Sequence, residues 1–317
     1  MTTLHTSQIN SIQIDQKISS AFGKFPQVIS LWNTLEAKLH SALSPGEPQN
    51  LLITGLSGTG KSTLLEEFAK LHPSIAHEEW TEVPVVYVKI HPRTTIKALA
   101  GLVLLKMGSP FWNKGNESQL TIQLQTLITA CKTRMIIFDE VNHLTDRGGV
   151  RTHYHVGDWI KQLCRPGGPV LVLAGIPRAK QLLATNDQLR SRFGEQVTVH
   201  ALSANGENIK LFSKVLKSFE RMLLPIPCID LGDAAVTRQF AFATDGRLRS
   251  ICGLLRGAVL IAVQQPNPKI DGQTLAQAFV KMIYNEATPE RNPFHSKFNG
   301  IALTRKGEPF APEAERG

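Results

Sequence analysis

The stretch GLSGTGKS at residues 55–62 decides the fold. It follows an apolar run at residues 51–53 and precedes a helical pattern at residues 63–71. It matches G-x-x-x-x-G-K-[ST], the pattern of a phosphate-binding loop between a strand and a helix. Its glycines let backbone N–H groups converge on phosphate oxygens. We therefore expect an ATP-binding loop here, rather than a glycine-rich turn without a ligand.

Two side chains of this loop have distinct expected roles. Lys61 reaches the β and γ phosphate oxygens, and the Ser62 hydroxyl can ligate Mg²⁺. Backbone groups and small polar side chains supply the other contacts to ATP. The residues expected to bind the nucleotide are Gly55, Ser57, Gly58, Thr59, Gly60, Lys61, Ser62 and Thr63.

A second apolar run, residues 135–138, ends in the carboxylates Asp139 and Glu140. In a parallel sheet, ligands bind at the edge where the strands end. We expect Asp139 to join Ser62 in holding Mg²⁺ and Glu140 to orient the attacking water. A kinase would need an acceptor pocket, so this pairing favours ATP hydrolysis over phosphotransfer.

Arginines follow later in the chain at two places. Arg192, in residues 187–193, can act as a catalytic arginine finger on the ATP of a neighbouring subunit, or can simply end a surface helix. In residues 245–249, Arg247 or Arg249 can report the nucleotide state to a second domain, or can belong to an ordinary helix start. The residues alone leave the choice between these two open.

Short apolar runs alternate with helical patterns over the first two thirds of the chain. This alternation predicts an α/β fold with a parallel sheet and helices on both faces. From residue 205 onward the patterns are helical, which predicts a small helical lid domain. The expected strands are residues 51–53, 83–90, 135–138 and 170–173.

Four segments follow from these patterns. Residues 1–48 form an N-terminal extension with one helix, and residues 49–204 form the nucleotide-binding core. Residues 205–287 form the helical lid. Residues 288–317 contain several prolines and few aliphatic residues, so we expect a flexible tail.

Composition limits the class of partner. The chain has 317 residues and a formal net charge of +9, with pI near 9.5, which favours a polyanion such as nucleic acid. Its N-terminus lacks a signal-like apolar run, and no later stretch is long enough to span a bilayer. The four cysteines form no C-x-x-C pair. We expect a cytoplasmic protein with reduced thiols and no membrane contact.

The order of these features resembles an AAA+ ATPase, and more narrowly the TniB/TnsC family of transposition regulators, relatives of IstB and MuB. The resemblance covers roughly residues 30–285. The loop 55–62 and the acidic strand end are common to many P-loop proteins, whereas the other matching stretches point to this family. The matching stretches are residues 55–62, 83–87, 136–140 with Leu144, 170–175, 192–193 and 246–248.

The resemblance implies an assembly and a set of partners. It implies rings or helical filaments around duplex DNA, with ATP at each subunit interface. Such proteins connect a target selector, TniQ-like or part of an RNA-guided complex, to a DDE transposase. It also implies DNA contacts from a lysine early in the helix after the second strand, which Lys97 matches, and from the loop beyond it.

That loop contains Lys114 and Asn116. Lys97, Lys114 and the nearby Arg93 can make sequence-independent, salt-sensitive phosphate contacts. The alternative is that they are ordinary solvated side chains.

The chain departs from the wider AAA+ pattern where the fourth strand ends. A polar sensor residue is common there, but this chain has Ala174-Gly175. His143 could contact the γ-phosphate instead, although a surface histidine is the simpler interpretation. Between the two lid arginines, the family pattern favours Arg247, whereas the broader G-x-x-R pattern would select Arg249; we select Arg247. Two other functions share the nucleotide motifs: an ATPase of the replication-initiator or clamp-loader type, and a signalling NTPase that acts only through protein interaction.

Overall fold

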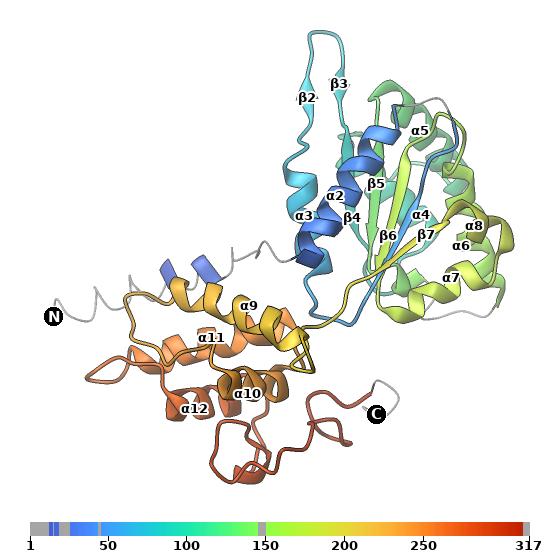
Figure 1. Ribbon diagram of the computed structural model, residues 1–317. Helices are drawn as coiled ribbons and strands as arrows, with labels where there is room; N and C mark the ends of the chain where they lie inside the picture. Colours follow the sequence, from blue (N-terminus) through green and yellow to red (C-terminus); the bar gives the residue numbers. More distant parts are fainter. Residues whose placement is uncertain (1–12, 15, 19–25, 44–45, 145–149, 313–317) are drawn as a thin grey trace. The chain divides into compact units, whose positions relative to one another are not determined.

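The computed structural model describes residues 13–14, 16–18, 26–43, 46–144 and 150–312. These residues form two compact units (Figure 1). One unit contains the sheet and spans Pro26–Ser57 and Lys61–Val199. The other, mainly helical, contains residues 200–312 together with residues 13–14 and 16–18 and Gly58–Gly60. In the described ranges, no helix is long and apolar enough to span a bilayer.

The sheet has five strands in the order β4-β5-β6-β1-β7, and all its pairs are parallel. The residues of β1, β5 and β6 are all buried, because helices cover both faces. This confirms the predicted α/β fold with a parallel sheet. The strands are β1 (Leu51–Thr54), β4 (Val85–Lys89), β5 (Met135–Asp139), β6 (Val170–Gly175) and β7 (Glu195–Thr198).

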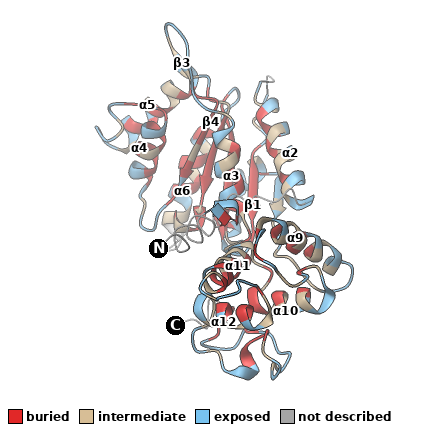
Figure 2. Ribbon diagram, turned by 90° about the vertical axis from the view of Figure 1, so that its left-hand side faces the viewer, coloured by how far each residue is buried: buried red, intermediate tan, exposed pale blue. Residues whose placement is uncertain are grey.

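Helices pack on the two faces of this sheet. In Figure 2, α4, α5 and α6 lie on one side of the buried strands, and α2 and α3 lie on the other. The helices are α2 (Pro26–Ser41), α3 (Lys61–Lys70), α4 (Ile96–Lys106), α5 (Glu117–Ala130), α6 (Val150–Leu163), α7 (Lys180–Ala184) and α8 (Asp187–Arg192). Two short 3₁₀ turns, η1 (Val141–Leu144) and η2 (Pro177–Ala179), follow β5 and β6.

Two strand features were not predicted. The edge strand β7 has the sequence Glu-Gln-Val-Thr, which carries no apolar run because most of it faces solvent. An antiparallel hairpin of β2 (Ile75–Ala76) and β3 (Thr81–Glu82) projects from the sheet unit (Figure 1). At its tip the His77 ring stacks on Trp80, with 4.3 Å between centroids.

From residue 200 to residue 312, the helical unit contains four helices of 11 to 15 residues. Asp233 and Asp271 cap the second and fourth of them, because their carboxylates accept hydrogen bonds from backbone N–H groups of the first turn. Ile14 and Ile18, from the N-terminal extension, belong to the apolar core of this unit. The helices are α9 (Asn208–Met222), α10 (Ala234–Thr244), α11 (Leu248–Ala262) and α12 (Gly272–Met282).

The segment 288–312 differs from the flexible tail expected from its composition. After the turn η3 (Pro289–Arg291), it buries Phe294, Leu303 and Phe310 in the core of the helical unit. A few widely spaced aromatic and aliphatic side chains thus anchor a segment that has almost no regular secondary structure.

A buried ion pair organises this C-terminal segment. Arg291 Nε and Nη2 donate to the two carboxylate oxygens of Glu308, at 2.7 and 2.8 Å. The guanidinium also donates to Asn299 Oδ1 and to the carbonyls of Ile301 and Ala302. These bonds satisfy the donors of a side chain that is only 10% exposed. The arginine therefore holds the segment's irregular loops together.

Replacing Arg291 by Ala should destabilise the helical unit. Removing one partner leaves the Glu308 carboxylate buried and unpaired, which costs about 3–5 kcal/mol. Chemical denaturation followed by circular dichroism would measure the loss. Lys210→Ala, which removes a surface pair with Glu207, is the matched control and should change little. If R291A unfolds like the control, the ion pair does not organise the segment.

Candidate functional site

The phosphate-loop candidate begins where β1 ends. Gly55 N–H donates to the Gly175 carbonyl at 3.2 Å, which ties the loop's first residue to the end of β6. A Cβ at Gly55 would lie 2.3 Å from the Val199 carbonyl oxygen. Glycine is therefore required because the chain that continues β7 passes directly against it.

Lys61 is the first residue of α3, and its side chain turns back into the loop. It is only 7% exposed, and Nζ donates to the carbonyls of Gly55 and Leu56 at 2.8 and 2.9 Å. The ammonium group is thus held against the loop backbone, where it can meet phosphate oxygens. Of the other predicted contacts, Thr59 is buried, Ser62 is half-buried, and Ser57 and Thr63 are exposed.

Two later glycines of the loop, Gly58 and Gly60, have backbone φ angles of +83° and +97°. Residues other than glycine rarely adopt such angles. Both belong to the helical unit. There, the Gly58 carbonyl accepts a hydrogen bond of 3.0 Å from the backbone N–H of Arg249.

The carboxylate of Asp139 is fully buried at the end of β5. Its Oδ1 accepts from the backbone N–H of Glu140, and its Oδ2 accepts from the Tyr87 hydroxyl, both at 2.9 Å. Glu140 is partly exposed and adopts φ of +59°, a left-handed conformation that is strained for this residue type. The two carboxylates therefore have different environments, as different roles would require.

Sequence reasoning missed Tyr87 and Asn142. Tyr87 lies on β4, 52 positions from Asp139, so only the sheet pairing brings the two together. Asn142, in η1, is 2% exposed, and its Oδ1 accepts from the backbone N–H of Ile176 at 3.3 Å. A polar side chain thus stands beside the Ala174-Gly175 strand end after all, but η1 supplies it. The buried Asn three residues after Asp139 was the available signal.

Arg192 is the last residue of α8 and is partly buried. Its guanidinium donates to the Cys164 carbonyl, and its own carbonyl accepts from Asn50 Nδ2 at 3.0 Å. Asn50, 2% exposed, also accepts from the backbone N–H of Leu171. The end of α8 is therefore anchored to the start of β1 and to β6.

Arg247 occupies the N-cap position of α11. Its Nε and Nη2 both donate to Asp245 Oδ2, at 3.0 and 2.8 Å. The Phe310 ring lies 5.2 Å from the guanidinium carbon, a cation–π arrangement. The C-terminal segment thus helps to orient the arginine selected from the sequence.

The candidate DNA-contacting residues are exposed in the sheet unit. Lys97 is the second residue of α4, and Arg93 has φ of +68° in the turn that precedes this helix. Lys114 lies in the loop between α4 and α5, with Nζ 5.2 Å from the centroid of the exposed Phe111 ring. Asn116 caps α5: its side chain accepts from the backbone N–H of Gln119 at 2.9 Å.

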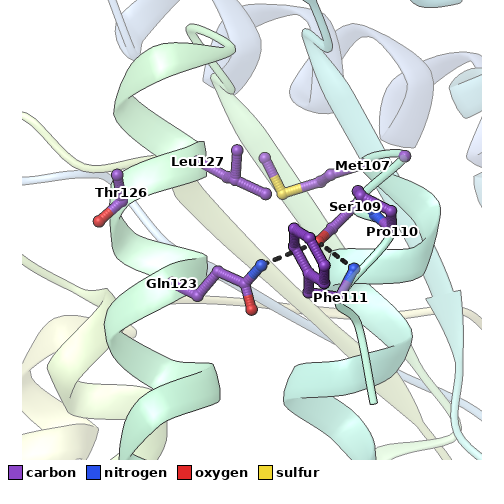
Figure 3. Close-up of a pocket in the computed structure, with 8 residues that line it drawn as sticks. Met107, Ser109, Pro110, Phe111, Gln123, Thr126 and Leu127 are labelled. Atoms are coloured by element: carbon purple, nitrogen blue, oxygen red, sulfur yellow. Dashed lines mark hydrogen bonds between the residues drawn. The ribbon is translucent and has the colours of Figure 1, made fainter. Parts of the chain in front are cut away.

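A pocket of about 370 Å³ underlies this loop (Figure 3). Within it, Ser109 Oγ accepts from Gln123 Nε2 at 2.9 Å and from the backbone N–H of Phe111 at 3.2 Å. These bonds tie the loop to α5, so Phe111 and Lys114 stand on a defined support. The pocket is lined by Met107, Gly108, Ser109, Pro110, Phe111, Gln123, Thr126 and Leu127.

Several solved structures share this fold at low sequence identity. A Cdc6p structure from Pyrobaculum aerophilum aligns with a TM-score of 0.63 and 17% identity, covering 87% of this chain and 73% of that one. The Aeropyrum pernix ORC2 protein, in ADPNP-ADP complexes, gives 0.61 and 14%, with 86% and 73% covered. The A. pernix ORC1 protein in complex with DNA gives 0.59 and 18%, with 80% and 65% covered. The chain therefore spans about two thirds to three quarters of these relatives.

No curated protein sequence matches the chain. The family model described as bacterial TniB protein matches residues 13–203, more than half of the chain. That range contains the phosphate loop, the Asp139-Glu140 strand end and Arg192. The chain belongs to the TniB family and is an AAA+ ATPase.

Proposed function

We propose that this ATPase regulates DNA transposition. In this proposal it assembles on duplex target DNA in its ATP-bound form and links a TniQ-like target selector, with or without an RNA-guided complex, to a DDE transposase. ATP hydrolysis then controls disassembly. The observation that carries the proposal is the TniB family match over residues 13–203. The charge of +9 and the exposed Lys97 and Lys114 support a DNA partner.

The residues at the strand ends fit a Mg²⁺–ATP complex. Burying a carboxylate as completely as Asp139 is costly, and both hydrogen-bond donors described for it are neutral groups. A cation beside it would offset that cost, and hydroxyl and carboxylate oxygens are the ligands that Mg²⁺ prefers. Ser62 and Asp139 would hold the ion, which would neutralise charge on the transferred phosphoryl group.

The other residues divide the remaining tasks. Lys61 binds the β and γ phosphates, and Glu140 polarises the attacking water. Arg192 of a neighbouring subunit stabilises the charge that develops in the transition state, and Arg247 reports the nucleotide state to the helical unit. Binding then depends on one subunit, whereas hydrolysis depends on two.

The solved structure of ORC1 with DNA favours a DNA-bound assembly without deciding its biological role. An initiator or clamp-loader function would share the site and the DNA affinity. Pull-down with a DDE transposase and a TniQ-like target selector separates the two, because only the transposition function requires direct binding to both.

Glu140→Gln should separate ATP binding from hydrolysis. Losing the general base lowers the hydrolysis rate by about 10²-fold or more, while nucleotide affinity persists. We expect the E140Q protein to form ATP-dependent assemblies on duplex DNA. In electron micrographs taken at successive times, these should persist longer than those of the wild type. Lys61→Ala should form none, and Glu79→Gln, on the exposed hairpin, should behave as wild type. Assembly by K61A, or turnover by E140Q at the wild-type rate, contradicts the proposal.

Mixing two inactive variants tests whether the site is shared between subunits. Arg192→Ala subunits keep their phosphate loop, and Lys61→Ala subunits keep the arginine. If Arg192 acts on a neighbour's ATP, a mixture hydrolyses ATP although neither variant does so alone. If no ratio of the two restores hydrolysis while both still associate in gel filtration, Arg192 acts within its own subunit or not at all.

Replacing Lys97 and Lys114 by Glu should weaken duplex DNA binding for all sequences alike. Each lost phosphate contact reduces the magnitude of the slope of log K against log salt concentration by about 0.9. The slope of the double variant should therefore be smaller in magnitude by about 2. Fluorescence anisotropy at several salt concentrations measures this slope. Lys281→Glu with Lys297→Glu carries the same charge change at exposed positions of the helical unit. Equal losses in both double variants would indicate a net-charge effect and contradict the assignment.

A further inference from the structure

Tyr87 stands on the sheet strand next to the one that ends in Asp139. The parallel pairing of β4 with β5 sets Val88 opposite Phe138 and Lys89 opposite Asp139. Val86 and Val88 point into the core that contains α4 and α5, so Tyr87 points to the other face of the sheet. There its hydroxyl reaches Asp139 Oδ2 at 2.9 Å.

This bond completes a matched pair of restraints on one carboxylate. The backbone N–H of Glu140 holds Oδ1, and the phenol holds Oδ2. Two donors on different oxygens fix both the position and the rotation of the carboxylate plane. A carboxylate has roughly four acceptor sites, so about two remain for other ligands.

The surroundings of Tyr87 disfavour ionisation of its phenol. Burial raises the pKa of Tyr87 far above its usual range, and the nearby Asp139 carboxylate raises it further. Glu66 of α3 and Glu140 act in the same direction.

We propose that Tyr87 is a positioning residue for ATP hydrolysis, holding Asp139 in the orientation that receives the Mg²⁺ water shell. The inference rests on the proposed role of Asp139 as a Mg²⁺ residue. In metal sites, replacing a donor that orients a metal ligand in this way typically lowers metal affinity or activity 10–100-fold.

Phenylalanine is the suitable probe of this bond. Tyr87→Phe keeps the ring and removes only the hydroxyl, so the carboxylate loses one restraint while the strand keeps its packing. Tyr154→Phe is the control, since Tyr154 lies on α6 with 49% of its surface exposed.

ATP hydrolysis by the full chain should be measured as a function of Mg²⁺ concentration. We expect Y87F to raise the half-saturating Mg²⁺ concentration about 10-fold. Its rate should largely recover at saturating Mg²⁺, and Y154F should match the wild type. Binding of a fluorescent ATP analogue supplies a readout without turnover: Y87F should weaken it with Mg²⁺ present and leave it unchanged in EDTA.

Asp139→Asn in the same assays distinguishes failure of the Tyr87 role from failure of the proposed Mg²⁺ role of Asp139. If D139N shifts the Mg²⁺ dependence and Y87F does not, the role of Tyr87 is overturned and that of Asp139 stands. If neither variant shifts it, the Asp139 assignment fails as well. Weakening by Y87F that is equal with Mg²⁺ and in EDTA would show a structural effect and overturn the proposal.

Discussion

The parallel backbone pairing of β1, β5 and β6 is the constraint on which the candidate site depends. It sets Thr54 opposite Gly175 and Phe138 opposite Leu173, so all three strands end at one edge of the sheet. The phosphate loop begins at that edge, and Asp139, the last residue of β5, lies there too. A shift of one residue would turn every side chain of a strand to the opposite face, and Asp139 would then point away from Tyr87.

Buried polar groups secure this register. Asn50 accepts from Leu171 N–H and donates to the Arg192 carbonyl, which connects the start of β1 to β6 and to the end of α8. Asn142 makes a similar connection at the other end of β6. A buried polar group that loses its partner costs about 1–3 kcal/mol, so other registers are penalised. The side chains that fix the fold therefore also fix the positions of the candidate catalytic groups.

The sequence predicted the parts of the fold whose patterns are local. The central strands are buried on both faces and read as continuous apolar runs, and the four helices of the helical unit follow helical periodicity. Strand β7 was not predicted because it lies at the sheet edge and has no apolar run, so only its backbone pairing makes it a strand. The packed C-terminal segment escaped because Arg291 and Glu308 are 17 positions apart. Tyr87 and Asp139 meet only through the sheet, so nothing local relates them.

The two arginines assigned to nucleotide response are held by contacts that can exchange. Arg192 donates to a neutral carbonyl, and Arg247 pairs with Asp245, whose side chain is 40% exposed. A hydrogen bond made by a charged group contributes about 1.5–3 kcal/mol, and an ion pair with one partly exposed partner lies towards the lower end of what ion pairs contribute. Each arginine thus has a resting partner that keeps it ordered without holding it permanently. In the proposed assembly, Arg192 would exchange its carbonyl partner for the ATP of a neighbouring subunit, whereas Lys61 and Asp139 would keep the backbone partners that they have here.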